Sequence, residues 1–306
     1  MKRMRRQGHS LRGERLFELG QRGFERLLKA CAHDSTLLML MADSRMNNRI
    51  SPFSDLAGRV VIVTGAAAGI GLSISNAFAE QGCQLVLLDV NEASLTETAK
   101  RLEKSGTHVI TVAGSVGEPE TARHTCAEAV RQYGRIDVLV NNAGVSSVHP
   151  SLELPLQEWK RVLDINLTGV FLCAQEAARK MIPAGGGVIV NIASIYGLVA
   201  APNRAAYCAT KAAVAMLTKV LAIEWAQDSL RVNAIAPGYV KTGFILDLVE
   251  QKKIDLESLK KRTPQGRLAT PEEIAQMSIF LASDISSHIT GQVIGVDGGW
   301  TAYGYI

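Results

Sequence analysis

Short apolar runs alternate with helical patterns along most of this chain, and this alternation constrains its fold more than any other feature. Continuous apolar strands joined through helices are typical of a parallel sheet that helices cover on both faces. The sequence therefore predicts an α/β, doubly wound fold with a seven-stranded, mainly parallel sheet, formed as a single domain by residues 51–306. The predicted strands are Val60–Val63, Leu85–Leu88, Val109–Val112, Ile136–Val140, Val188–Ile192, Arg231–Ile235 and Val293–Val296.

The first fifty residues differ in composition from the rest of the chain. They hold eleven Lys and Arg against five Asp and Glu, so the positive net charge of +4 comes from this segment. Leucines and phenylalanines near helical spacing, with arginines between them, are compatible with a basic amphipathic helix for a membrane surface or a partner. An organellar transit peptide is another interpretation, although Glu14, Glu18 and Glu25 are unusual in one. We expect a poorly ordered basic extension over residues 1–50, or a start placed too early, since Met46 stands just ahead of the first strand.

Charge, hydropathy and cysteine usage exclude several classes of protein. Beyond residue 50 the chain is nearly neutral, so it lacks the basic character of a nucleic-acid-binding domain. The sequence contains no run of about 18 apolar residues, so we expect no membrane-spanning helix. The five cysteines are widely spaced without a Cys-x-x-Cys pair, and the six histidines show no ligand spacing. We therefore expect no metal, no disulfide framework, no nucleic-acid partner and a reducing, cytoplasmic location.

A glycine-rich turn joins the first predicted strand to the first predicted helix. It reads Thr-Gly-Ala-Ala-Ala-Gly-Ile-Gly from Thr64 to Gly71. Gly65 permits a tight turn, Gly69 lets a phosphate approach the backbone, and Gly71 lets the helix pack close to the strand. Around Ile70 the start of the helix offers free N–H groups and a partial positive charge to an anion. In this strand–turn–helix context the glycines predict a binding site for the phosphates of a nucleotide.

Asp89 ends the second predicted strand, eighteen residues after Gly71. A carboxylate at that point accepts hydrogen bonds from the adenosine ribose hydroxyls and repels a 2′-phosphate. No Lys or Arg occupies positions 66–68, and Val90 follows the carboxylate. These residues favour NAD over NADP, and the alternative is a carboxylate that only faces water.

Tyr207 and Lys211 stand four residues apart in a predicted helix, so their side chains share one face. Tyrosine has a pKa near 10, and an ammonium about 4 Å away could lower that pKa toward 7. The pair could therefore transfer a proton, although it is also a common feature of helix surfaces. Ser194 follows the fifth predicted strand, where its hydroxyl could donate to a substrate carbonyl. Asn166 lies in a helical region and could hold a water near Lys211, or simply break the helix.

Together these motifs resemble those of the short-chain dehydrogenase/reductase family. The resemblance covers about residues 56–299 and implies a Rossmann-like, dinucleotide-binding fold. The matching motifs are Thr64-Gly65-x-x-x-Gly69-x-Gly71, Asn141-Asn142-Ala143-Gly144, Asn166, Ser194, Tyr207-x-x-x-Lys211, Pro237-Gly238 and Val296-Asp297-Gly298-Gly299.

The resemblance implies roles for individual residues. Tyr207 would exchange a proton with the substrate oxygen, and Lys211 would lower the pKa of Tyr207 and bind the nicotinamide ribose. Ser194 would polarise the carbonyl, and Asn166 would support a proton-relay water. Ser115 departs from the acidic residue that the family often carries near the adenine. The residues implied to bind the cofactor are Gly65, Gly69, Ile70, Gly71, Asp89, Ser115, Val116, Asn142, Ala143, Gly144, Tyr207, Lys211, Pro237, Gly238, Val240 and Thr242.

The substrate end is less specific in the sequence. Residues 239–270 predict a mobile lid with an apolar inner face, or else a small helical pair that packs on the body. Loop 145–155 is expected to line the same pocket, which indicates a secondary alcohol or ketone with apolar character. Further expected lining residues are His149, Ile195, Tyr196 and Leu198, and the resemblance implies that Ile192 packs near the nicotinamide. The resemblance also implies a homotetramer that pairs through the apolar helices near 168–181 and 207–227, and the alternative is that these faces are buried within one chain.

Three functions remain open from the sequence. The first is an NAD-dependent alcohol dehydrogenase or ketone reductase that transfers a hydride to or from the nicotinamide ring. The second is a 3-oxoacyl carrier-protein reductase, which the absence of a basic residue in the glycine-rich turn disfavours, since such enzymes generally use NADP. The third is a nucleotide-sensing scaffold without catalysis, against which the set Asn166, Ser194, Tyr207 and Lys211 argues.

Overall fold

The computed structural model of the protein describes residues 53–252 and 254–304. The basic extension predicted over 1–50 lies outside these residues, as does Cys31. Within Phe53–Ile306, which form one unit, strands and helices alternate as the sequence predicts.

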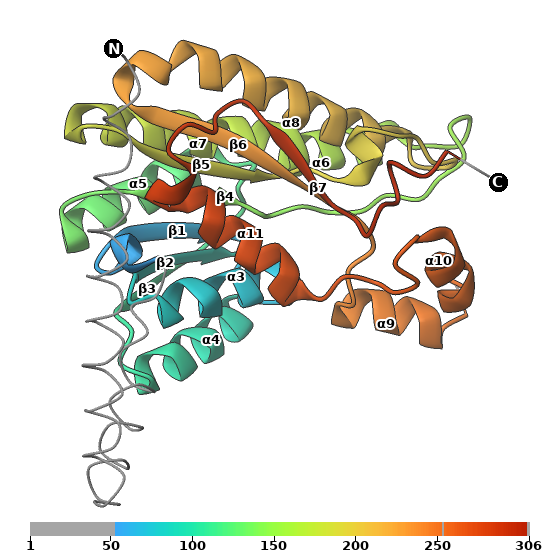
Figure 1. The fold of residues 1–306 in the computed structure, drawn as a ribbon, viewed down its shortest axis with the longest axis horizontal. Helices are drawn as coiled ribbons and strands as arrows, with labels where there is room; N and C mark the ends of the chain where they lie inside the picture. Colours follow the sequence, from blue (N-terminus) through green and yellow to red (C-terminus); the bar gives the residue numbers. More distant parts are fainter. Residues whose placement is uncertain (1–52, 253, 305–306) are drawn as a thin grey trace, which may run out of the picture. The chain divides into compact units, whose positions relative to one another are not determined.

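Seven parallel strands form one sheet in the order β3-β2-β1-β4-β5-β6-β7 (Figure 1). The chain adds strands outward on one side of β1 and then returns to its other side, so a topological switch point lies between β1 and β4. Ligands of doubly wound proteins bind outside the carboxyl ends of the strands at this point. The strands are β1 Val60–Thr64, β2 Gln84–Asp89, β3 Val109–Ala113, β4 Val138–Asn141, β5 Gly187–Ile192, β6 Leu230–Pro237 and β7 Val293–Val296.

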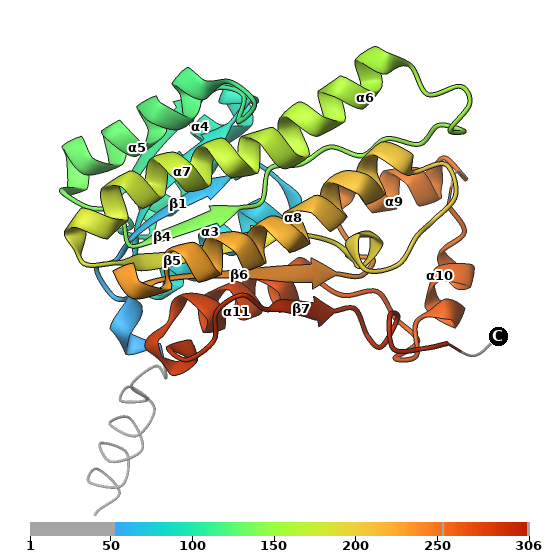
Figure 2. The same ribbon diagram turned by 90° about the horizontal axis from the view of Figure 1, so that it is seen from above.

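Helices cover both faces of the sheet (Figures 1 and 2). Buried residues of α3, α4 and α11 form one cluster with the sheet, and those of α5, α7 and α8 form another. The helices are α3 Gly69–Glu80, α4 Glu92–Lys104, α5 Pro119–Tyr133, α6 Leu156–Leu163, α7 Gly169–Met181, α8 Ala205–Glu224, α9 Gly243–Glu250, α10 Leu256–Arg262 and α11 Pro271–Ala282.

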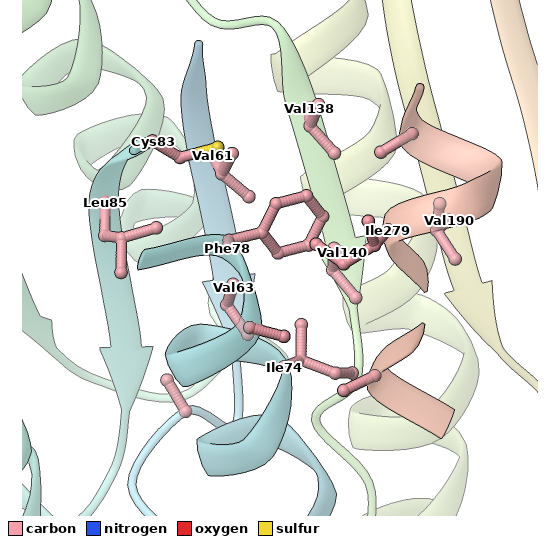
Figure 3. Packing of buried hydrophobic residues seen from close by; sticks show 14 of the residues in the cluster. Val61, Val63, Ile74, Phe78, Cys83, Leu85, Val138, Val140, Val190 and Ile279 are labelled. Carbon is pink, nitrogen blue, oxygen red and sulfur yellow. The ribbon is translucent and has the colours of Figure 1, made fainter. Parts of the chain in front are cut away.

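Alternate residues of each central strand enter opposite cores. Val61 and Val63 of β1 pack in the cluster that holds Phe78 of α3 (Figure 3). Their neighbours Val60 and Ile62 pack in the cluster on the opposite face. A strand buried on both faces needs apolar side chains at every position, which explains the continuous apolar runs of the sequence.

The helical region around Asn166 is one long helix with a local distortion. A π-helical turn, η2 (Asp164–Thr168), joins α6 to α7 without a break in the chain direction. π turns are often found at functional sites, and Asn166 lies fully buried within this one. The predicted disturbance of the helix at Asn166 is therefore present as a π turn.

Among the described residues, helix α8 is long and apolar enough to cross a bilayer by length and composition alone, with a mean hydropathy of 1.4. A core helix passes the same test, so this finding does not contradict the expectation of no membrane-spanning segment. Lys211 and Lys219 interrupt its apolar sequence, which is why no continuous run was visible. Val214 and Leu221 of this helix are buried in the cores beside β6, so α8 packs as one layer of the α/β body.

Three of the cysteines are buried core residues. Burial raises the pKa of the Cys83, Cys126 and Cys173 thiols to about 12 in each case. Thiols with such a pKa stay protonated and unreactive at neutral pH. Among the described residues no group of three or more His, Cys, Asp or Glu side chains is placed to hold a metal ion.

Candidate active site

One continuous cavity of about 750 Å³ lies at the carboxyl ends of the strands. It reaches from Asp89 at the end of β2 to Tyr207 and Lys211 on α8. Its volume lies within the range of small-molecule and cofactor sites. The predicted site residues that line it are Gly65, Gly69, Ile70, Asp89, Ser115, Val116, Asn142, Ala143, Gly144, Ser194, Tyr207, Lys211, Pro237, Gly238, Val240 and Thr242.

Gly71 does not line the cavity, and its position explains why a glycine stands there. A Cβ on Gly71 would lie 2.0 Å from the Gly65 carbonyl oxygen and 2.5 Å from Asn142 Nδ2. No side chain fits at such distances, so the first turn of α3 can approach the end of β1 only without a Cβ. Gly65 itself has a φ of +64°, in the left-handed region that glycine adopts without strain.

Gly69 leaves the start of α3 open. With a φ of +54° it begins the helix, and among the described residues a Cβ there would meet only Thr242 side-chain atoms, the nearer at 3.5 Å. The N-cap residue, Ala68, makes no side-chain hydrogen bond to the helix. The N–H groups of a helix terminus without such a cap are available to an anion. The start of α3 therefore presents unpaired N–H groups at the cavity wall, where Thr242 also lies.

Asn142 ties the glycine-rich turn to β4. Its Nδ2 donates to the carbonyls of Thr64 and Gly65, both at 3.0 Å. In return the Thr64 hydroxyl accepts the backbone N–H groups of Asn142 at 3.1 Å and Ala143 at 3.0 Å. These four hydrogen bonds fix the ends of β1 and β4 against each other at the switch point.

Asp89 is held by the backbone on both sides. Its Oδ2 accepts the Ala67 N–H at 3.0 Å, and its Oδ1 accepts the Asn91 N–H at 2.9 Å. These bonds orient the carboxylate at the cavity wall beside the turn. Among the described residues lining the cavity, the only Lys and Arg are Arg204 and Lys211, which line its other end. The Asp89 end therefore offers hydroxyl-binding oxygens and no cation.

Tyr207 and Ser194 meet at the other end of the cavity. Ser194, just after β5, is buried, and its Oγ accepts the Tyr196 N–H at 3.1 Å. Burial raises the pKa of Tyr207, and the neighbouring Ser194 hydroxyl offsets part of that rise. The direction is opposite to the predicted one, because burial has the larger effect and Lys211 is not among the causes.

Lys211 is buried beneath Tyr207. Its Nζ donates to the Ile192 carbonyl at 2.7 Å and lies 5.8 Å from the centre of the Tyr207 ring. Burial lowers the pKa of Lys211 to about 8. None of the ion pairs among the described residues involves Lys211, so no carboxylate offsets this effect of burial. The ammonium can thus lose its proton at mildly alkaline pH.

This low pKa predicts a pH dependence of stability that can be measured. From pH 8 to 10.5 the unfolded chain keeps a proton on Lys211 that the folded protein releases, so folding is increasingly favoured as pH rises. Relative to the Lys211→Met variant, the wild type is expected to gain about 3 kcal/mol over this interval. Urea unfolding of ligand-free protein at both pH values measures the gain. The control is Lys219→Met, at an exposed position of the same helix, for which the wild type is expected to gain no such stability between the two pH values. If the free energies of unfolding of the wild type and Lys211→Met differ by the same amount at both pH values, the prediction is wrong.

Asn166 lies behind the cavity wall instead of lining it. Its Oδ1 accepts the Val145 N–H at 2.7 Å, and its Nδ2 donates to the Val145 carbonyl at 2.9 Å. A longer bond of 3.4 Å reaches the Thr210 hydroxyl on α8. These bonds occupy both amide hydrogens, so the side chain braces the loop after β4 against the active-site helix.

The substrate end contains residues that the sequence reasoning missed. Tyr239, after β6, places its hydroxyl 2.9 Å from that of Tyr196, and Arg204 precedes Tyr207 by one helical turn. A basic residue so close to the Tyr–Lys pair was a usable signal. His149 and Leu198 were expected to line the cavity and do not, whereas Ile192, Ile195 and Tyr196 do.

The predicted lid is a helical pair. Helices α9 and α10 lie beyond the carboxyl ends of β6 and β7 (Figure 2). Ile245 and Leu248 of α9 and Ile254 of the connection line the cavity. The Arg262 side chain donates to the Trp300 and Tyr303 carbonyls. The segment thus presents an apolar inner face and is tied to the C-terminal segment.

Comparison with known proteins agrees with this geometry. A family model described as Enoyl-(Acyl carrier protein) reductase matches residues 65–301. The chain is 41% identical over 247 residues to cis-4-hydroxycyclohexanecarboxylate dehydrogenase of Sinomonas cyclohexanicum, covering 80% of this chain and 98% of the relative. It is 39% identical over 244 residues to 3-oxoacyl-[acyl-carrier-protein] reductase of Thermotoga maritima, with coverage of 80% and 98%.

A solved structure has the same fold. The gluconate 5-dehydrogenase from Burkholderia cenocepacia J2315, in complex with NADP and tartrate, superposes with a TM-score of 0.77 and 37% identity. The match covers 82% of this chain and 99% of that one. The sheet is Rossmann-like, and one cavity holds both the glycine-rich turn and the Tyr–Lys pair. Together with the matches to known proteins, this shows that the chain belongs to the short-chain dehydrogenase/reductase family of oxidoreductases.

Proposed function

We propose that this protein is an NAD-dependent dehydrogenase that interconverts a secondary alcohol and its ketone, with Tyr207 as the acid/base. One observation carries the proposal: a single cavity joins the glycine-rich turn and Asp89 to Ser194, Tyr207 and Lys211. Binding a dinucleotide along this cavity brings the reacting carbon of a substrate next to a proton-transferring group. Holding both partners in one site removes about 7–11 kcal/mol of the barrier.

Each residue then has a chemical task. In ketone reduction the Tyr207 phenol gives its proton to the substrate oxygen, and in alcohol oxidation the phenolate takes that proton. The Ser194 hydroxyl donates to the same oxygen as charge develops there. The nicotinamide supplies the hydride donor or acceptor when it is bound. Lys211 lies beneath the ring of Tyr207 and anchors the end of β5 through the Ile192 carbonyl.

The proposed reaction is tested with a panel of alcohols, polyols and ketones, each assayed with both cofactors. We expect alcohol oxidation with NAD to be fastest at alkaline pH, because burial raises the pKa of Tyr207 and the base form is needed. Absence of turnover with every substrate and both cofactors, in protein that binds NADH, would favour a sensing role.

Asp89 is proposed to select NAD. We expect Asp89→Asn, which keeps the shape but removes the charge, to lower the NAD-to-NADP ratio of kcat/KM about tenfold. The reason is that charged hydrogen bonds to the ribose weaken and the repulsion of a 2′-phosphate disappears. Asp228→Asn, in the 3₁₀ turn after α8, is the control and leaves the ratio as it is. A wild type that already prefers NADP would refute this assignment.

A 3-oxoacyl carrier-protein reductase is the second candidate. It is supported by the Thermotoga maritima relative and by the description of the family model. The cavity wall around Asp89 argues against it, since no Lys or Arg among the described lining residues stands there to bind a 2′-phosphate. Reduction of an acetoacetyl thioester with NADPH, compared with the alcohol panel, decides between the two.

We also propose a homotetramer in the cytoplasm. Exposed apolar side chains lie on α7 and α8, on one face of the sheet: Phe171, Met216, Val220 and Ile223, the last 79% exposed. Apolar surface of this kind marks an interaction site, and a measured solution mass tests the assembly. The free thiols of the core fit a reducing compartment.

A further inference from the structure

Arg204 is a cation at the substrate end of the cavity. It is the N-cap residue of α8, is partly buried and lines the cavity with Tyr207. Its Nη1 donates to the Ser146 hydroxyl at 3.0 Å, and its guanidinium carbon lies 5.8 Å from the centre of the Tyr196 ring. The positive charge acts on both phenols, since it lowers the pKa of Tyr207 and of Tyr196 against the effect of burial.

No carboxylate of the described protein neutralises this charge. None of the ion pairs among the described residues involves Arg204. Among the described residues, Asp89 is the one carboxylate that lines the cavity, and it lies beside the glycine-rich turn, at the end that would hold the nucleotide. A guanidinium has five donors, and the hydrogen bonds of Arg204 to side chains use one of them. The remaining donors of this partly buried guanidinium are therefore available to an anion that enters the cavity.

The surroundings of Arg204 define the rest of the ligand. Apolar side chains from three segments line the same cavity: Val148, Ile195, Ile245, Leu248 and Ile254. The hydroxyls of Tyr196 and Tyr239 share one hydrogen bond. Each phenol carries one proton and the shared bond uses one, so the pair keeps one further proton to donate.

We propose that the substrate carries a carboxylate that Arg204 binds, on an apolar carbon skeleton whose hydroxyl-bearing carbon lies at Tyr207. This substrate class rests on the proposed dehydrogenase function. The Tyr196 ring lies 5.8 Å from the guanidinium carbon of Arg204, and the spare donor of the Tyr196–Tyr239 pair serves a second oxygen of the same carboxylate. Arginine and carboxylate form strong charge-assisted hydrogen bonds, so the pair orients the substrate as well as holding it.

The first test is a binding measurement that needs no turnover. Calorimetry on the protein with NADH compares straight-chain carboxylates from butanoate to octanoate with the primary amides of equal length. We expect the wild type to bind the carboxylates about 10- to 100-fold more tightly than the amides, the effect of a charged hydrogen bond. In Arg204→Met this preference falls to about twofold or less. Arg123→Met, which removes an exposed arginine of α5, keeps the full preference.

The second test is turnover of hydroxy acids and their methyl esters. The acid-to-ester ratio of kcat/KM is expected to drop about 10- to 100-fold in Arg204→Met and to recover partly in Arg204→Lys. If Arg204 only packs on Tyr196, the variant lowers thermal stability and affects acids and esters equally, which overturns the proposal. Equal binding of carboxylates and amides by the wild type overturns it as well. If the wild type oxidises neutral alcohols and shows no preference for acids, the proposed substrate class is wrong and the proposed dehydrogenase function stands. If the protein binds carboxylates through Arg204 but turns over none of the substrates, the proposed dehydrogenase function is wrong instead.

Discussion

The Tyr207→Phe variant is expected to lose about 10²- to 10⁴-fold in kcat, which is the usual contribution of a positioned acid/base. The substitution removes one oxygen and leaves the ring over Lys211, so the packing of α8 stays the same. Affinity for NADH, measured by fluorescence titration, is expected to stay within about threefold of the wild type, because the phenol acts on the substrate oxygen. The rise of alcohol oxidation with pH is expected to flatten in the variant, since that rise reports the deprotonation of Tyr207.

Tyr133→Phe is the matched control for this experiment. Tyr133 lies at the end of α5, is partly buried and does not line the cavity. Its replacement is expected to leave kcat unchanged. Equal turnover of the wild type and Tyr207→Phe would show that another group moves the proton.

Gly71→Ala is expected to destabilise the fold by about 3 kcal/mol, at the upper end of the usual cost of overpacking. The new Cβ would lie 2.0 Å from the Gly65 carbonyl oxygen, so α3 must move away from the end of β1. That movement also weakens the Asn142 hydrogen bonds to Thr64 and Gly65. For a domain of this size the melting temperature would fall by about 6–12 °C, and NADH binding would weaken with it.

Gly243→Ala is the control for the glycine substitution. Gly243 opens α9, and apart from its chain neighbours and the backbone of its own helix no described atom lies within 4 Å of a Cβ placed there. Alanine in a helix is more favourable than glycine, so the melting temperature is expected to stay or rise. A Gly71→Ala protein as stable as this control would mean that the turn has more room than its geometry shows.

The sheet was predictable because burial on both faces leaves a strong sequence signal. Each of the seven predicted strands lies within an observed strand or overlaps one. Alternate residues such as Val60 and Val61 enter different cores, so every position of such a strand is apolar and the strand stands out in the sequence. The choice between a lid and a helical pair was not predictable. Short helices such as α10 depend on long-range contacts, here between Arg262 and the C-terminal segment, and local sequence does not encode these.

The candidate site was predictable where local spacing carries the chemistry. Tyr207 and Lys211 share a helix, so their proximity follows from helical geometry. The direction of the pKa shift of Tyr207 was not predictable, because it depends on burial by distant segments. The same holds for Tyr239, which meets Tyr196 from another strand end. Asn166 was found by its sequence position, but only the structure shows its bonds to Val145.

The brace between the glycine-rich turn and β4 has a consequence for synthesis of the chain. Asn142 holds the Gly65 carbonyl from a position 77 residues further along, and β2 and β3 are made in between. During synthesis on the ribosome, the hydrogen bonds between Asn142 and the glycine-rich turn can form only after β4 has been made. Contacts of such long sequence separation also form slowly. Residues as late as Ile254 complete the cavity wall. A ligand of this cavity can therefore stabilise the chain only once synthesis has passed Ile254.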